Sequence, residues 1–226
     1  MLNIFVGMDD RIPIQTHVCM SSIARRASKP VALTPLRLST LPLKRKGLTS
    51  FSFARFLVPY LMGYKGRALF LDGDIAVNCD VAELFDHADQ DHAVYVSEVH
   101  PQFERAAVIL FQCDHPHNSI LTPEFVEKTD LQLHMLGWTD RIGTLPMNAN
   151  FCIGYAKHRP LESVMVAHWT MGVPVWPITA DSEHADFWHN ERRAMCAVRS
   201  SWEDLMGASV HSKPGPDGQP IPKYKG

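Results

Sequence analysis

The stretch that decides the fold is Arg67-Ala-Leu-Phe-Leu-Asp72-Gly73-Asp74-Ile-Ala-Val77. Two carboxylates flank one glycine between two short apolar runs, 68–71 and 75–77. These runs predict a buried strand that breaks and then resumes. Two charges inside a core would be very costly to desolvate, so Asp72 and Asp74 must lie at a strand end or meet a cation.

The carboxylate pair has two interpretations. Hard oxygen ligands with open coordination positions suit Mn²⁺ or Mg²⁺ carrying a substrate diphosphate. Gly73 would let the backbone turn and approach such a ligand closely. The alternative is an Asp-Gly turn at a strand end, which is a common structure. A lone D-x-D sequence favours the turn, whereas the apolar frame and the segments described below favour the metal.

The length, composition and net charge of the chain are those of an ordinary globular protein. Its 226 residues suffice for one α/β domain, and 46% are hydrophobic and 20% charged. We expect one nucleotide-sugar-binding domain over residues 1–210 and a Pro/Gly-rich tail over 211–226. The net charge of −2 gives no global electrostatic case for nucleic acid or an anionic membrane as a partner.

Cysteine usage and the N-terminus bear on location. The five cysteines are odd in number and never in C-x-x-C spacing, so they predict reduced, mostly buried thiols (Cys19, Cys79, Cys113, Cys152 and Cys196). The N-terminus lacks the basic start and long apolar stretch of a signal peptide, and no segment reaches transmembrane length. We therefore expect a soluble, cytoplasmic protein.

The order of predicted elements indicates the fold class. Strands are expected at 2–6, 31–38, 93–96, 106–111 and within 161–169, and helices at 14–27, 51–61, 81–87 and from Thr122. Thr49 or Ser50 would cap the helix at 51–61, and Thr122 the helix that follows it. Pro35 places its strand near a sheet edge. Strands that alternate with helices predict an α/β protein with a mostly parallel sheet covered on both faces.

Four segments carry a family resemblance: Ile4-Phe-Val-Gly7-Met-Asp9-Asp10, Ser52-Phe-Ala-Arg55-Phe-Leu-Val-Pro59, the stretch 67–77, and His168-Trp-Thr-Met-Gly172-Val-Pro174. In this order, over about residues 2–176, they resemble the segments of GT-A-fold glycosyltransferases. The chain is similar to the retaining enzymes of glycosyltransferase family 8 and to an uncharacterised bacterial and phage branch beside them. The resemblance implies a Rossmann-like mixed, mostly parallel sheet sandwiched by helices.

The resemblance also implies roles for individual residues. Asp9 and Asp10, after Gly7, would contact the base and ribose of a nucleotide. Asp72, beside Gly73, would divide its contacts between the ribose and the metal, and Gly172 belongs to the late motif at the donor. The direct metal ligands would be Asp74 and His168, with Asp72 as the partial one. Arg55 would face the donor sugar and the metal-site carboxylates.

The activity that the resemblance implies is transfer of a sugar from a nucleotide-diphosphate sugar, with a uridine diphosphate sugar as the expected donor and Mn²⁺ or Mg²⁺ as cofactor. The sequence shows no obvious catalytic base, which fits a retaining enzyme; an inverting enzyme would need an acceptor-side carboxylate, and Asp140 is the candidate. The acceptor is unknown: a glycan, a protein, a small molecule and modified DNA all remain open, with DNA disfavoured by the charge. The oligomeric state is also open.

Each assigned residue has a structural alternative. Asp9 would be a charge at a helix N-terminus, and Arg55 a surface ion pair. His168 would be a core histidine beside Trp169. Asp140, assigned to sugar hydroxyls, would be a loop residue, and Asn150, assigned to the acceptor or sugar, a turn residue.

Other histidines compete for the metal. His211 in the tail is a rival for the role of His168. His115 and His117, around Pro116, suggest a metal pair, but we reject it because no carboxylate partner stands in register.

Three departures from the family pattern support a second hypothesis. Val173 stands where a lysine usually grips the diphosphate, a role that Lys157 or Lys213 could take. The family's Asn-Ala-Gly appears as 105–107, Arg-Ala-Ala, and its Asp-Gln-Asp as 140–142, Asp-Arg-Ile. The alternative is a non-catalytic nucleotide-sugar-binding or scaffold protein with a decayed site.

Overall fold

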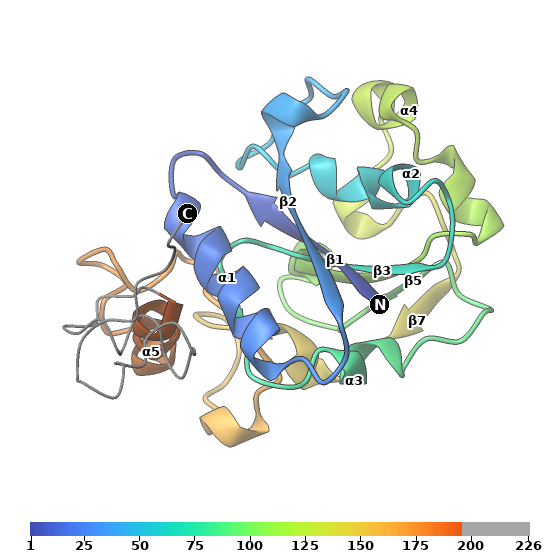
Figure 1. Ribbon diagram of the computed structural model, residues 1–226. Coiled ribbons are helices and arrows are strands. Elements are labelled where there is room, and N and C mark those ends of the chain that lie inside the picture. The colour runs from blue at the N-terminus through green and yellow to red at the C-terminus, as the bar shows by residue number, and fades with distance from the viewer. Residues whose placement is uncertain (196–226) are drawn as a thin grey trace, which may run out of the picture.

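A computed structural model describes residues 1–195, which form two sheets with helices around them (Figure 1). The larger sheet has the strand order β2-β1-β3-β6-β5-β7. Its β1 pairs in parallel with β2 and β3, β6 runs antiparallel to β3 and β5, and β5 is parallel to β7. The α/β class and the mostly parallel sheet are thereby confirmed. The strands are β1 Leu2–Met8, β2 Val31–Arg37, β3 Arg67–Leu71, β5 Val94–Val96, β6 Val108–Gln112 and β7 Ile142–Thr144.

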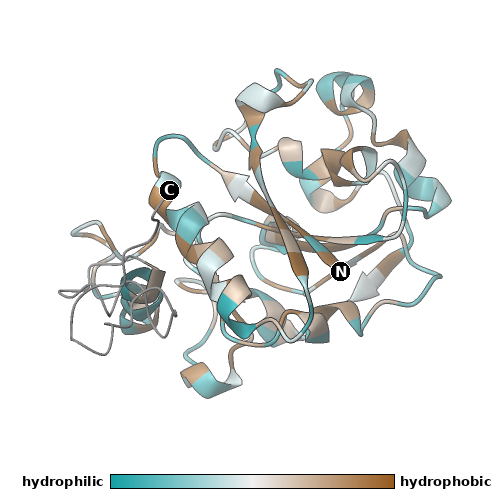
Figure 2. Cartoon of the chain, viewed as in Figure 1, coloured by the Kyte–Doolittle hydropathy of each residue, from teal (hydrophilic) through white to brown (hydrophobic). Residues whose placement is uncertain are grey.

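Successive apolar side chains of the central strands point to opposite faces of this sheet, which explains why helices cover both faces. Phe5 and Phe70 belong to the core on one face, and Ile4 and Leu69 to the core on the other. The first core includes side chains of α2 (Val58–Leu61) and α4 (Pro123–Lys128), and the second those of α1 (Pro13–Arg26) and α3 (Ala82–Phe85). The sheet is therefore sandwiched, with apolar central strands (Figure 2).

The strand predicted to break and resume does so at Asp72 to Asp74. After β3 ends, the chain enters β4 (Ile75–Val77) of a three-stranded sheet with the order β4-β9-β8. The partners of β4 are β9 (Val166–His168) and, beyond it, β8 (Phe151–Cys152). Phe151, Trp169 and Trp188 belong to a separate core around this small sheet. The two carboxylates therefore stand at the junction of the two sheets.

Some predicted boundaries were wrong. Neither Thr49 nor Ser50 caps a helix; the Ser52 hydroxyl bonds to Thr49 instead, and a 3₁₀ turn, Ala54–Leu57, precedes the short α2. By contrast, Thr122 does cap α4, because its hydroxyl accepts the Phe125 N–H at 3.1 Å. The strand expected from residue 106 begins at 108, after the 3₁₀ segment Gln102–Ala107.

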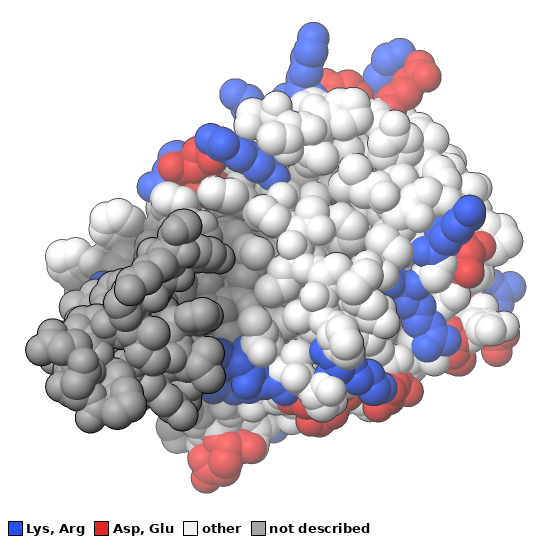
Figure 3. Space-filling view, in the orientation of Figure 1, with Lys and Arg blue, Asp and Glu red and all other residues white. Residues whose placement is uncertain are grey.

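Charged side chains of both signs are interspersed around one face of the molecule (Figure 3). This distribution agrees with the net charge of −2. Within residues 1–195, no helix has both the length and the apolar character needed to cross a membrane. The tail predicted at 211–226, with the rival His211, lies outside the described residues, as do Cys196 and Lys213.

A buried ion pair joins the first and last described helices. Glu191, on α5 (Ala185–Met195), is 4% exposed at its side chain and accepts bonds from Arg25 at 2.9 Å and Arg26 at 2.7 Å, both on α1. A carboxylate withdrawn from water in this way depends on its cations. Glu124 and Lys128, at 2.9 Å on α4, form an exposed pair that offers a comparison.

We predict that Glu191→Gln lowers the free energy of unfolding by about 2 kcal/mol, because two charge-assisted bonds lose their anion. Glu124→Gln is the matched control and should change little, since exposed pairs contribute little. Urea unfolding of the two variants beside the parent protein measures both. Equal effects would show that Glu191 does not fasten α5 to α1.

Candidate metal and nucleotide-sugar site

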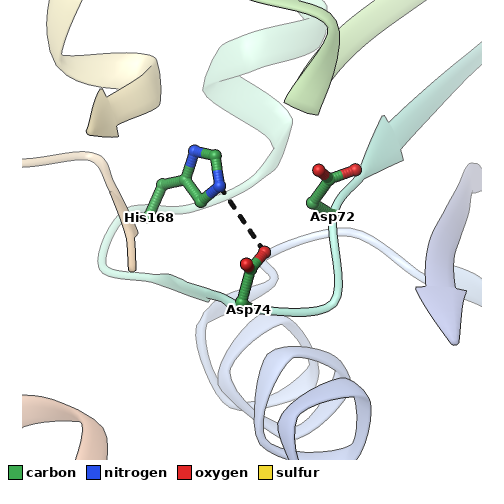
Figure 4. A group of neighbouring side chains, drawn as sticks. All are labelled: Asp72, Asp74 and His168. Carbon is green, nitrogen blue, oxygen red and sulfur yellow. Dashed lines mark ion pairs between the residues drawn. The ribbon is translucent and has the colours of Figure 1, made fainter. Parts of the chain in front are cut away.

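A cluster of candidate metal-binding side chains lies where two strands end and a third begins. Asp72 follows β3, Asp74 precedes β4, and His168 is the last residue of β9. Register pairing of Ile75 with His168, and a bond from the Trp169 N–H to the Asp74 carbonyl at 3.1 Å, hold these segments together. One ligand atom from each of Asp72, Asp74 and His168 lies within 4.8 Å of the others (Figure 4). The structure therefore brings together the three residues predicted to hold a metal.

Gly73 is required by close packing. A Cβ atom on Gly73 would lie 2.5 Å from the carbonyl oxygen of Gly7 and 3.0 Å from the Thr16 hydroxyl. Gly7 is similarly constrained, since its own Cβ would overlap the Phe51 ring. The loop of the carboxylate pair therefore lies directly on the end of β1. Gly172, by contrast, has a φ of +106° and serves a turn that favours glycine.

Arg55 clamps the first carboxylate. Its Nη2 donates to Asp72 Oδ2 at 3.2 Å, and its Nη1 donates to the Ala106 carbonyl at 2.7 Å. Its Nε donates to the Ser52 carbonyl at 3.0 Å, so the buried guanidinium is fixed on three sides. Arg55 is buried and so is not a surface ion pair, and of the two metal-site carboxylates it contacts Asp72.

The carboxylates keep free acceptor atoms. Asp72 Oδ1 and Asp74 Oδ1 are both buried and accept no hydrogen bond from any described residue. Arg55 Nη1 stands 3.0 Å from Asp72 Oδ1 but is directed at Ala106, and His168 Nε2 is 3.5 Å from Asp74 Oδ1. Buried oxygens without donors are costly, and a cation between them would remove that cost. The donor set of two carboxylates and an imidazole fits Mn²⁺.

Burial and neighbouring charges shift the pKa of both Asp72 and His168. Burial raises the pKa of Asp72 to about 7, against the attraction of Arg55, and the negative charge of Asp74 adds to the rise. Burial lowers the pKa of His168, but the nearby negative charge of Asp74 raises it by more, so the net shift is well upward. In the absence of a cation, Asp72 thus depends on the charge of Arg55, and Asp74 on the imidazole of His168.

Asn150 determines the orientation of the His168 ring. The Asn150 Nδ2 group donates to the Glu104 carbonyl at 2.9 Å, so Oδ1 is the atom that faces His168 Nδ1 at 3.0 Å. Nδ1 must then carry the proton, which leaves Nε2 directed toward Asp74. A metal-binding histidine is commonly oriented by such a partner. Asn150, predicted to contact the acceptor or the sugar or else to be a turn residue, is buried beside the histidine.

The predicted nucleotide loop lies at the same edge of the sheet, because β1 and β3 are parallel and Asp9 and Asp72 follow their carboxyl ends. Asp9 is buried, and its carboxylate is held by Arg11 at 2.6 and 2.9 Å; these bonds lower its pKa. Asp10 is half exposed and pairs with Arg37 at 2.7 Å. Both acidic groups thus already have cationic partners.

Asp140 lies elsewhere. It precedes β7, and β7 and β5 run in the direction of β3, so Asp140 stands at the sheet edge opposite Asp72. Its side chain is 81% exposed and 3.5 Å from His117. The structure does not bring Asp140 to the candidate site. It also corrects our reason for rejecting His115 and His117, since a carboxylate does lie beside that pair.

Sequence reasoning missed Glu104, which stands just before β6 at the site edge. Burial raises the pKa of Glu104; the charge of His168 opposes this rise, and that of Asp74 adds to it. The Glu104 carboxylate is therefore close enough to the cluster to sense its charges. Nothing in the sequence around residue 104 indicates this, because the signal is the antiparallel entry of β6 beside β3.

The architecture is the fold of GT-A glycosyltransferases. GlyE from Streptococcus pneumoniae superposes with a TM-score of 0.65 at 19% identity, covering 85% of this chain and 60% of that one. The bifunctional glycosyltransferase WbbM gives 0.64 at 11%, covering 90% and 50%. A mutant of LgtC gives 0.62 at 13%, covering 90% of this chain and 99% of that one. The chain thus spans about half the length of WbbM and 60% of GlyE.

A relative establishes the family. Protein CDI from Arabidopsis thaliana is 34% identical to this chain, and the match covers 83% of this chain and 85% of that protein. The chain belongs to the family of Protein CDI. No protein-family model matches the sequence.

We predict that Asn150→Ala lowers the free energy of unfolding by about 1 to 3 kcal/mol, because it leaves the Glu104 carbonyl and His168 Nδ1 buried and unpaired. Asn148→Ala is the matched control: Asn148 lies on the same 3₁₀ turn, is less buried, and donates to the Ser163 carbonyl at 3.0 Å. Urea unfolding should show the smaller loss for Asn148→Ala. The reverse order would contradict the role assigned to Asn150.

Proposed function

We propose that this protein is a metal-dependent glycosyltransferase that moves a sugar from a uridine diphosphate sugar to an acceptor, with retention of anomeric configuration. One observation carries the proposal: Asp72, Asp74 and His168 converge, with unpaired carboxylate oxygens, at the carboxyl edge of a GT-A-type sheet. Ligands of open α/β sheets commonly bind at that edge. The four segments that resemble family 8 enzymes support the choice of donor and of retention.

Asp74 and His168 would hold a divalent cation, Mn²⁺ or Mg²⁺, and Asp72 would share its oxygens between the cation and the donor. When bound, the cation would act as a Lewis acid toward the departing diphosphate. Asn150 keeps His168 Nε2 turned toward the site. Arg55 holds Asp72 in place and supplies the positive charge nearest to it.

The choice of retention rests on the resemblance to the retaining enzymes of family 8. Asp140, the candidate base of an inverting enzyme, stands at the opposite edge, so this mechanism does not use it. Burial raises the pKa of Glu104, and the charges of His168 and Asp74 also act on it, so this carboxylate belongs to the surroundings of the cluster. In the retaining mechanism the acceptor proton leaves with the diphosphate, and no protein base is needed.

A second candidate is a non-catalytic nucleotide-sugar-binding protein with a decayed site. The observation in its favour is Val173, which is fully buried in the core around the small sheet and offers the diphosphate no charge. Donor hydrolysis separates the two candidates. An enzyme should release sugar from the donor slowly in the presence of Mn²⁺, whereas a binding protein should bind the donor without cleaving it.

We propose the cytoplasm as the location. The four cysteines within the described residues are free, and burial raises the pKa of Cys79 and of Cys113 to about 12. Such thiols suit a reducing compartment.

We predict that UDP with Mn²⁺ stabilises the parent protein and that Asp74→Asn removes this gain. A ligand at a hundredfold excess over its dissociation constant adds about 2.7 kcal/mol to the stability of the native state. Asn keeps the size of the side chain but removes the charge that holds the cation. Melting temperatures with UDP, in Mn²⁺ and in chelator, measure the gain for each protein.

Asp130→Asn is the control, because Asp130 is exposed on a loop after α4. It should keep the full gain with UDP and Mn²⁺. Two results would count against the proposal: equal stabilisation by UDP in chelator and in Mn²⁺, or an unchanged Mn²⁺-dependent gain in Asp74→Asn.

A further inference from the structure

A cavity of about 460 Å³ opens beside the candidate metal site. Its walls come from three segments: the loop after β5, the loop after β7, and β8 with the loop beyond it. The lining residues are Glu98, Val99, His100, Met147, Asn150, Phe151, Cys152, Tyr155, Ala156, Lys157 and Arg159. Since β5 and β7 run in the direction of β3, their carboxyl ends reach the edge where Asp72 stands. A volume of this size accommodates a small ligand.

The cavity and the metal site share a wall. Asn150 lines the cavity and also bonds to His168 Nδ1 at 3.0 Å. Cys152 lines it too, with its Sγ 3.9 Å from the same nitrogen. A molecule in the cavity would thus lie one side chain away from the metal ligand. A second substrate in the cavity would therefore stand beside a donor diphosphate bound at Asp72 and Asp74.

The rim of the cavity is basic. Lys157 and Arg159 are exposed, and neither side chain pairs with a carboxylate among residues 1–195. The acidic member of the lining, Glu98, is 3.6 Å from Arg105, which offsets its charge. Unpaired cations at the mouth of a cavity attract an anionic group.

The rest of the lining suits a carbohydrate ring. Tyr155 and Met147 are 46% and 65% exposed, although both are large apolar side chains. Phe151 and Cys152 form a buried apolar wall between them. An amphipathic ring can lie on such apolar surfaces while polar groups at the rim take its substituents.

We propose that this cavity binds the acceptor, and that the acceptor is a sugar or polyol bearing an anionic group, a phosphate or a carboxylate, held by Lys157 and Arg159. This assignment rests on the proposed glycosyl transfer. In the reaction the bond between the anomeric carbon and the diphosphate oxygen breaks. A bond from that carbon to the acceptor hydroxyl oxygen forms, and the hydroxyl proton leaves with the diphosphate.

Binding without donor or metal tests the proposal. Glucose 6-phosphate, glucose 1-phosphate, inositol 1-phosphate and glucuronate are titrated into the full chain in chelator by ligand-observed NMR. Glucose, inositol and inorganic phosphate serve as the neutral and ringless comparisons. We expect at least one anionic sugar or polyol to bind about tenfold more tightly than its neutral parent, and than inorganic phosphate, since a charge-assisted bond is worth about that factor.

The double variant Lys157→Gln/Arg159→Gln should remove this preference, and Lys65→Gln, at an exposed turn before β3, should keep it. A panel in which no anionic compound exceeds its neutral parent would overturn the proposal. So would a preference that survives the double variant. Because chelator and absence of donor exclude the metal site from the measurement, a failure here is distinct from a failure of metal-dependent donor binding.

Discussion

The structure depends on the confinement of two carboxylates, one residue apart, at the junction of two sheets. Asp72 and Asp74 repel each other at this junction, where partial burial reduces screening by water. Arg55 neutralises one side of the pair and His168 faces the other. Gly73 allows the loop between them to rest on the end of β1, so the two groups cannot move apart easily. A compact cation is the chemical partner that such an arrangement favours.

Strong local patterns made much of this predictable. The apolar runs on either side of Asp72 and Asp74 could only be buried strands, and the charges then had to lie at their ends. Thr122 and Pro123 predicted the start of α4, because a capping threonine and a proline in the first turn are local signals of a helix start. His168 was found through its motif, and the structure confirmed its approach to Asp74.

The sequence could not predict which residues reach the site where this depends on the direction of a strand in the sheet. Asp140 was assigned to the site from its neighbours in the chain, but β7 carries it to the far edge of the sheet. Glu104 lies near the site because β6 runs antiparallel to β3, and the sequence gives no signal of strand direction. Asn150 contacts His168 from beside the two-residue strand β8, which is too short to show a periodic pattern. The helix expected at 51–61 begins later, as the 3₁₀ turn at 54–57 followed by α2, and Ser52 and Thr49 bond to each other before it.

The most direct test of the central claim is the location of manganese. Crystals grown with UDP and Mn²⁺ would be measured at the manganese absorption edge, where anomalous scattering marks the ion itself. The account predicts one strong peak within coordination distance of an Asp74 oxygen and His168 Nε2, and in contact with the diphosphate. Bound UDP with no peak there, or a peak held by other side chains, would contradict it.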